Sequence, residues 1–187
     1  KLREDQILFR AAAPGGTSLA SDADFVPARV ADDVIAAGGV GKFSAPVLDR
    51  IVASKALDVR PFINEVDQGM RGGSTPQDLE TMMQLLYLRF TQPRADQGAF
   101  AAMAAQAKSL LANQSASPDV VFEQTIGETL SGNHLRRRPE TPATVDQWNL
   151  DKSFAYYKAR FADASNFTFV FVGSFTLDTI KPLVETY

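Results

Sequence analysis

Residues 166–173 read Asn-Phe-Thr-Phe-Val-Phe-Val-Gly and form the clearest strand signal in the chain. Aromatic and β-branched side chains favour strands, and the closing glycine is a turn signal. Because nearly every position of this run is apolar, we expect the strand to be central and buried. Residues 151–161 before it and residues 177–187 after it carry apolar side chains at helical spacing. A helix, a buried strand and a second helix are therefore predicted in this order.

Closer to the N-terminus, short strands precede a long run of helices. Apolar runs bounded by turn residues predict three further strands, and helical spacing behind capping residues predicts the helices between them. The predicted strands cover residues 7–12, 57–63 and 65–72, and the predicted helices cover residues 21–38, 44–52, 75–90, 96–113 and 117–130. Pro61 has no N–H to donate, so its strand should lie at a sheet edge or carry a bulge. This order predicts an α+β domain with helices packed on one face of a mainly antiparallel sheet.

The chain has one histidine, His134, and no cysteine. These residue types bind most transition metals in proteins and run much acyl-transfer chemistry at neutral pH. The net charge of -3 provides no general cationic field for nucleic acid, and there is no run of about 18 apolar residues that would span a membrane. We therefore expect a non-catalytic chain without a metal site, a nucleic-acid partner or a membrane span.

Length and composition are those of one globular domain. The 187 residues are 45% hydrophobic and 10% aromatic, which suffices for one core. The first residue is Lys1 rather than methionine, and the apolar stripe of the last helix still runs at Tyr187. We therefore expect residues 1–187 to be a single domain that is cut from a longer polypeptide at both ends.

The segment from His134 to Phe175 resembles the insulinase or pitrilysin-like zinc peptidases, which are also called inverted-motif zinc peptidases. The resemblance rests on a loop with histidine and proline, a helix that ends in tyrosine and a second aromatic, and an asparagine before an apolar strand that closes on Val-Gly. These residues are His134, Pro139, Tyr157, Phe161, Asn166, Val172, Gly173, Ser174 and Phe175. The order of the upstream elements is also that of one domain of the family. The chain is most similar to the third of four homologous domains in two-halved bacterial enzymes, whose second half is inactive and closes over the substrate chamber.

The resemblance also shows where this chain departs from the family. Catalytic members carry His-x-x-Glu-His, in which two histidines bind zinc and the glutamate activates water. The matching positions here hold Arg29 and Asp33 in place of the histidines and Asp32 in place of the base. The later helix, which supplies a further glutamate ligand in the family, offers Gln106 and Lys108 instead. We therefore expect no cofactor in this chain and zinc elsewhere in the parent protein.

Asp32 and Asp33 have two interpretations. Adjacent acids can differ in pKa and share acid and base roles in a hydrolase. Neighbours on a helix point about 100° apart, however, so a solvated face or a pairing with Arg29 is favoured over a hydrolytic pair.

The loop around His134 is expected to be structural or to make a contact. His134 is interpreted as a hydrogen-bonding residue rather than a ligand or base. Three roles are open for the adjacent arginines Arg136, Arg137 and Arg138. They could bind acidic residues of a neighbouring domain, lie in solvent, or bind a peptide carboxylate, and we favour the interdomain role.

The resulting hypothesis is a non-catalytic domain of a zinc metalloendopeptidase, which helps to enclose a peptide substrate while zinc and catalysis reside in an upstream domain. Its partners would be other domains of the same polypeptide and the peptide itself, and the resemblance implies a periplasmic location. The alternative is a structural or binding relative whose whole parent has lost peptidase activity. An independent carboxylate-based hydrolase is a third class.

Overall fold

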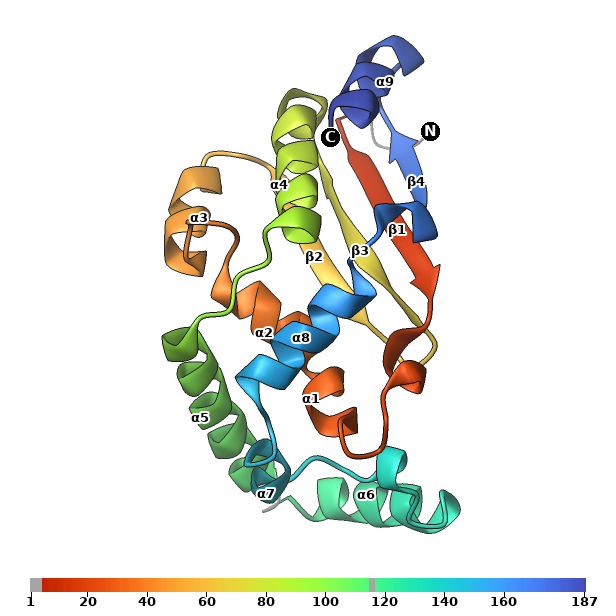
Figure 1. Cartoon of the computed structure of the whole chain (residues 1–187). Helices are drawn as coiled ribbons and strands as arrows, with labels where there is room; N and C mark the ends of the chain where they lie inside the picture. Colours follow the sequence, from red (N-terminus) through yellow and green to blue (C-terminus); the bar gives the residue numbers. More distant parts are fainter. Residues whose placement is uncertain (1–4, 115–116) are drawn as a thin grey trace.

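The computed structural model describes residues 5–114 and 117–187, and within them four strands form one antiparallel sheet (Figure 1). The strand order is β2-β3-β1-β4. The strands are β1 (Ile7–Pro14), β2 (Leu57–Ile63), β3 (Asp67–Ser74) and β4 (Thr168–Gly173). β2 lies at one edge of the sheet, as predicted from Pro61. Proline has no N–H to donate, and a strand at the edge can lack this donor on its open side.

β4 lies at the other edge, so the prediction of a central, buried strand is wrong. Phe169, Val170 and Val172 are 39%, 51% and 44% exposed. A strand whose residues are all apolar has no alternation of apolar and polar side chains to show whether one or both of its faces are buried. The neighbouring strands and helices decide this. Phe167, just before the strand, is the residue of this region that enters the core, together with part of Phe171.

The helices follow the predicted order, with some changes at their ends. The α-helices are α1 (Phe25–Arg29), α2 (Ala31–Gly38), α3 (Ala45–Val52), α4 (Leu79–Thr91), α5 (Gln97–Gln114), α6 (Pro118–Leu130), α7 (Pro142–Val145), α8 (Leu150–Arg160) and α9 (Leu177–Thr186). Short 3-10 turns are η1 (Gly16–Leu19), η2 (Pro76–Asp78), η3 (Leu135–Arg137) and η4 (Ala164–Asn166). α2 and α4 contact β2 directly, and α8 packs on α1 and α2. The predicted α+β fold, with helices on one face of an antiparallel sheet, is confirmed.

Three local differences from the predicted elements have physical causes. The single helix expected over 21–38 is broken at Val30, whose backbone leaves the helical region with φ -106° and ψ 7°. β3 begins at Asp67, two residues later than predicted, because Asn64 and Asp67 close the hairpin turn through hydrogen bonds. α7 was not predicted, although Thr141 and Thr144 form a capping box around its first turn.

A buried aromatic cluster joins α8, α4 and the start of β4. The rings of Tyr157 and Phe161 stack with centroids 4.3 Å apart, and Phe167 lies 5.4 Å from Phe161. Phe90 packs edge-on against both phenylalanines. Stacked and edge-on pairs add to the burial of apolar area, so this cluster is the centre of the core.

Beside this cluster lies a buried charge, Arg89. Its Nη1 donates to the carbonyl oxygens of Ile35 at 3.2 Å and Gly39 at 3.3 Å, which satisfies the C-terminal end of α2. The hydroxyl of Tyr157 donates to the Arg89 carbonyl oxygen. Burial lowers the pKa of Arg89 and raises the pKa of Tyr157. The arginine therefore fixes the position of α2, the helix that carries Asp32 and Asp33.

Candidate functional site

The structure brings the altered metal motif and the loop around His134 to the same end of the molecule. Arg29 at the end of α1 and Arg136 from η3 line one cavity of about 190 Å³. The remaining lining comes from Thr17, Phe25 and the β2–β3 turn at residues 63–65. Residues more than a hundred positions apart thus form one site.

Asp32 lies partly buried in the first turn of α2, against the end of β2. Its Oδ2 accepts a hydrogen bond from the backbone N–H of Ile63 at 3.1 Å. Burial, and secondarily the charge of Asp33, raises the pKa of the Asp32 carboxyl to about 6. Asp32, which the resemblance places at the position of the catalytic base, is therefore a partly buried carboxyl whose pKa lies closer to neutrality than usual.

Asp33 and Arg29 do not pair with each other or with Asp32. Asp33 is exposed, and Arg29 Nη2 forms an ion pair with Glu140 Oε1 at 3.3 Å. Of the two expected alternatives, the pairing with Arg29 is not formed, whereas Asp33 lies in a solvated position. The break at Val30 separates Arg29 from the helix that carries the aspartates, so the spacing of a continuous helix does not apply.

The donors at this position do not fit zinc. An arginine has no lone pair to offer a metal, and the guanidinium of Arg29 is held by Glu140. Gln106 on α5 is exposed, and Lys108 forms an ion pair with Asp146. Within residues 5–114 and 117–187, no group of three or more histidine, cysteine, aspartate or glutamate side chains lies close enough to hold a metal ion.

Arg136 binds other residues of this domain. Its Nη1 donates to the Thr17 carbonyl oxygen at 2.8 Å, and its Nη2 donates to the Ala20 carbonyl oxygen at 2.7 Å. Nε and Nη2 also bond to Asp22 Oδ1. The guanidinium lies 5.0 Å from the ring centre of Phe25, within reach of a cation–π interaction. Every nitrogen of this guanidinium is therefore engaged by the segment between β1 and α1.

The other residues of the loop remain nearer the surface. His134 Nδ1 accepts the backbone N–H of Arg136 at the start of η3. Arg137 forms an ion pair with Glu65 at 2.9 Å, and Arg138 Nε donates to the side chain of Asn133 at 2.9 Å. The loop is thus tied to the β2–β3 turn, and its role towards a substrate or another domain stays a prediction.

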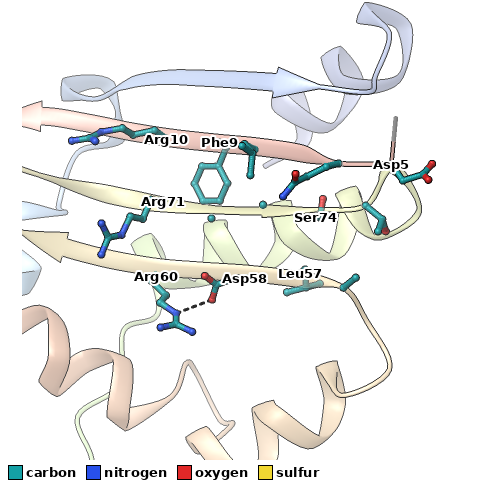
Figure 2. Close-up of a pocket in the computed structure, with 14 residues that line it drawn as sticks. Asp5, Phe9, Arg10, Leu57, Asp58, Arg60, Arg71 and Ser74 are labelled. Carbon is teal, nitrogen blue, oxygen red and sulfur yellow. Dashed lines mark hydrogen bonds and ion pairs between the residues drawn. The ribbon is translucent and has the colours of Figure 1, made fainter. Parts of the chain in front are cut away.

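Sequence reasoning missed a larger hollow of about 1180 Å³ on the face of the sheet that the helices leave open (Figure 2). Its lining includes Arg10, Arg60 and Arg71, one from each of three neighbouring strands. Exposed and buried positions alternate along β1 in the structure, but its sequence Ile-Leu-Phe-Arg-Ala-Ala-Ala-Pro is nearly all apolar and gives no such alternation. The pairing of the three strands is not readable from the chain either.

The arrangement of strands and helices places this chain in a known fold class. It is the fold of the M16, or pitrilysin-like, peptidase domains, and the resemblance drawn from the sequence is confirmed. The chain is 23% identical over 186 residues to a probable zinc protease PqqL of Haemophilus influenzae, covering 98% of this chain and 20% of that protein. No family model matches the sequence.

Two solved structures are similar over nearly the whole chain. The periplasmic protease PqqL from Escherichia coli matches with a TM-score of 0.80 and 19% identity, covering 99% of this chain and 20% of that one. A peptidase M16 inactive domain from Pseudomonas fluorescens matches with a TM-score of 0.77 and 14% identity, covering all of this chain and 45% of that one. The chain therefore spans about one fifth of the length of the PqqL relatives.

Proposed function

We propose that this chain is a non-catalytic domain of a zinc metalloendopeptidase and that it helps to enclose the peptide substrate. Zinc and bond cleavage then reside in an upstream domain of the same polypeptide. The observation that carries the proposal is similarity over the whole chain to a probable zinc protease. The single histidine of the chain supports it, as does the resemblance that places Arg29 and Asp33 at the positions of the two histidine ligands.

The partners in this proposal are the other domains of a longer polypeptide and the peptide itself. The match to only one fifth of the PqqL proteins supports the presence of further domains. The description of the E. coli relative as periplasmic supports the same compartment for this protein. No helix among the described residues is long and apolar enough to cross a membrane.

The loop from His134 to Arg138 is proposed to contact a neighbouring domain or the peptide. Arg137 and Arg138 are exposed beside the cavity that Arg29 and Arg136 line. Arg136 makes its contacts within the domain and so supports the loop. Arg137 and Arg138 make exposed contacts, with Glu65 and Asn133, and an acid of a partner could replace these contacts.

Two measurements on the full-length polypeptide and on this chain test the proposal. The full-length protein should hold one zinc ion and cleave an internally quenched peptide, whereas calorimetry on this chain should detect no tight zinc site. Submicromolar zinc binding to this chain that is lost in Asp33→Ala would overturn the assignment of an inactive domain. The exposed Asp49→Ala is the matched control.

The alternative function is a structural or binding relative whose whole parent has lost zinc. The replaced histidines in this chain fit that function equally well, because they exclude zinc only here. A full-length protein with neither zinc nor peptidase activity, and no His-x-x-Glu-His in its sequence, would favour this alternative.

A further inference from the structure

Three arginines form a row across the open face of the sheet. In the strand register, Arg10 of β1 pairs with Arg71 of β3, and Arg71 pairs with Arg60 of β2. Directly paired residues on neighbouring strands point to the same face. The residues flanking them along the strands are largely buried on the helix face, so the arginines point away from the helices (Figure 2).

This arrangement is unfavourable for the isolated sheet. Like charges directly opposite each other destabilise a strand pair. Nearby carboxylates compensate the outer two arginines: Arg10 Nη2 pairs with Asp67 at 3.0 Å, and Arg60 Nε pairs with Asp58 at 2.9 Å. The guanidinium of Arg71, between them, has no hydrogen-bond or ion-pair partner in the part of the chain that the structure describes. The central guanidinium is therefore available to an incoming anion.

An apolar strip continues the row towards β4. Val170 pairs with Arg10 in the register, and Val172 pairs with Leu8. Leu8 is 49% exposed, and both valines are similarly exposed. On β3, Gly73 stands between Leu8 and Asp58, so the floor of the hollow carries no side chain at that position. Guanidiniums beside exposed aliphatic groups are typical of a surface that binds another polypeptide.

We propose that this arginine row, Arg60, Arg71 and Arg10, with the strip of Leu8, Val170 and Val172, docks an acidic, amphipathic segment of a peptide substrate. The inference rests on the proposed function, because a substrate reaches this face only if the domain lines a peptide chamber. Carboxylates of the segment bind the guanidiniums, which match carboxylate geometry in a bidentate manner, and its apolar side chains cover the strip. Asp5 at the opposite end of the hollow repels carboxylates there and so orients the segment (Figure 2).

Fluorescence anisotropy on this chain tests the docking surface. The probe is a short labelled peptide that alternates glutamate with valine, and the control peptide has glutamine in place of each glutamate. The glutamate peptide should bind more tightly, and the difference should shrink as salt is added. Equal binding of the two peptides would overturn the proposal.

Substitutions of the three arginines test whether the peptide binds at the arginine row. Arg71→Gln should weaken the glutamate peptide roughly 1.5- to 5-fold, and the triple change Arg10→Gln, Arg60→Gln and Arg71→Gln on the order of tenfold or more. The matched control removes three exposed positive charges elsewhere, by Lys42→Gln, Arg50→Gln and Lys181→Gln, and should leave the affinity unchanged. Equal losses in both triple variants would mean that only net charge matters. If circular dichroism shows that the triple row variant does not fold, two measurements still test the proposal. These are the comparison of the two peptides on the unmodified chain and the affinity of Arg71→Gln for the glutamate peptide.

Two further outcomes would contradict the proposal. Single-stranded DNA that binds as tightly as the glutamate peptide would indicate a general anion surface. In the full-length protein, the row variant should raise KM for a glutamate-rich substrate and leave KM for its glutamine counterpart unchanged. A lowered melting temperature with an unchanged KM would instead assign the face to a contact between domains. Failure of the proposed function and failure of the docking surface can be distinguished. A full-length protein without zinc or activity would contradict the proposed function, whereas the anisotropy measured on this chain tests the docking surface alone.

Discussion

Replacing Asp32 by asparagine is expected to stabilise the domain at neutral pH and to change it little in mild acid. Burial raises the pKa of the Asp32 carboxyl from its ordinary value of 3.8 to about 6, so the folded state binds the proton more tightly than the unfolded state. The stability associated with the neutral carboxyl is therefore fully present below pH 3.8 and is lost as the pH rises through about 6. Asparagine is neutral at every pH, and its amide oxygen can still accept the Ile63 N–H.

The size of the effect follows from the two pKa values. A shift of about two pH units corresponds to at most about 3 kcal/mol of lost stability at neutral pH, at roughly 1.4 kcal/mol per unit. Because the side chain keeps some access to solvent, we expect Asp32→Asn to gain about 1–3 kcal/mol near pH 7.5 and less than about 1 kcal/mol near pH 4.

The assay is urea unfolding by circular dichroism over a series of pH values for both proteins. The difference between variant and parent at each pH removes the contributions of the other carboxyl groups, which titrate in both. Asp49→Asn, an exposed change on α3, is the control and should stay within about 0.5 kcal/mol at every pH. A variant that is less stable than the parent by a constant amount at all pH values would refute the reasoning, because Asp32 would then be a charged group that its hydrogen bonds stabilise.

Three further predictions concern the core, the loop and the metal. Phe161→Ala should lower the free energy of unfolding by about 3–5 kcal/mol in urea titrations, whereas the partly exposed Phe169→Ala should cost only about 1–2 kcal/mol, and equal losses would contradict the difference in burial of the two side chains. Arg136→Ala should cost about 1–3 kcal/mol because the Ala20 carbonyl oxygen loses its side-chain donor and the Thr17 carbonyl oxygen keeps only the Ala20 N–H, whereas Arg138→Ala should stay within about 0.5 kcal/mol in thermal melts. Zinc should bind this chain no better than it binds Asp33→Ala in calorimetry, and a tight site in the unmodified chain alone would contradict the expected loss of the metal site.

Local patterns predicted most of the secondary structure. β2 was predicted with its observed bounds, and α5 and α6 within a residue at each end, because capping residues and helical spacing act over a few positions. The hairpin shift at Asp67 and the break at Val30 were not predictable in this way. The hairpin shift comes from hydrogen bonds between Asn64 and Asp67, which strand propensity does not encode. The break at Val30 accompanies the packing of α2 against α8 and β2, which lie far away in the sequence.

The candidate site was predictable in its chemistry and not in its geometry. The chain has a single histidine, so it cannot supply a pair of histidine ligands, and no fold can change that. Arg29 binds Glu140, and Arg136 binds the segment after β1. Both contacts join residues that are more than a hundred positions apart in the sequence. Nothing in the local sequence records which of several acids or carbonyl groups an arginine meets.

The sequence by itself determined the order of strands and helices, the α+β class and the absence of an imidazole pair, because each follows from residue types and short-range periodicity. Only the tertiary structure decided that β4 lies at an edge, that Asp32 is desolvated against β2, and that Arg10, Arg60 and Arg71 share one row. These properties arise from strand register and layer packing, which join segments distant in the chain. A shift of one residue in the pairing would turn the arginines of a strand towards the core, so the register is set by the burial of the opposite face.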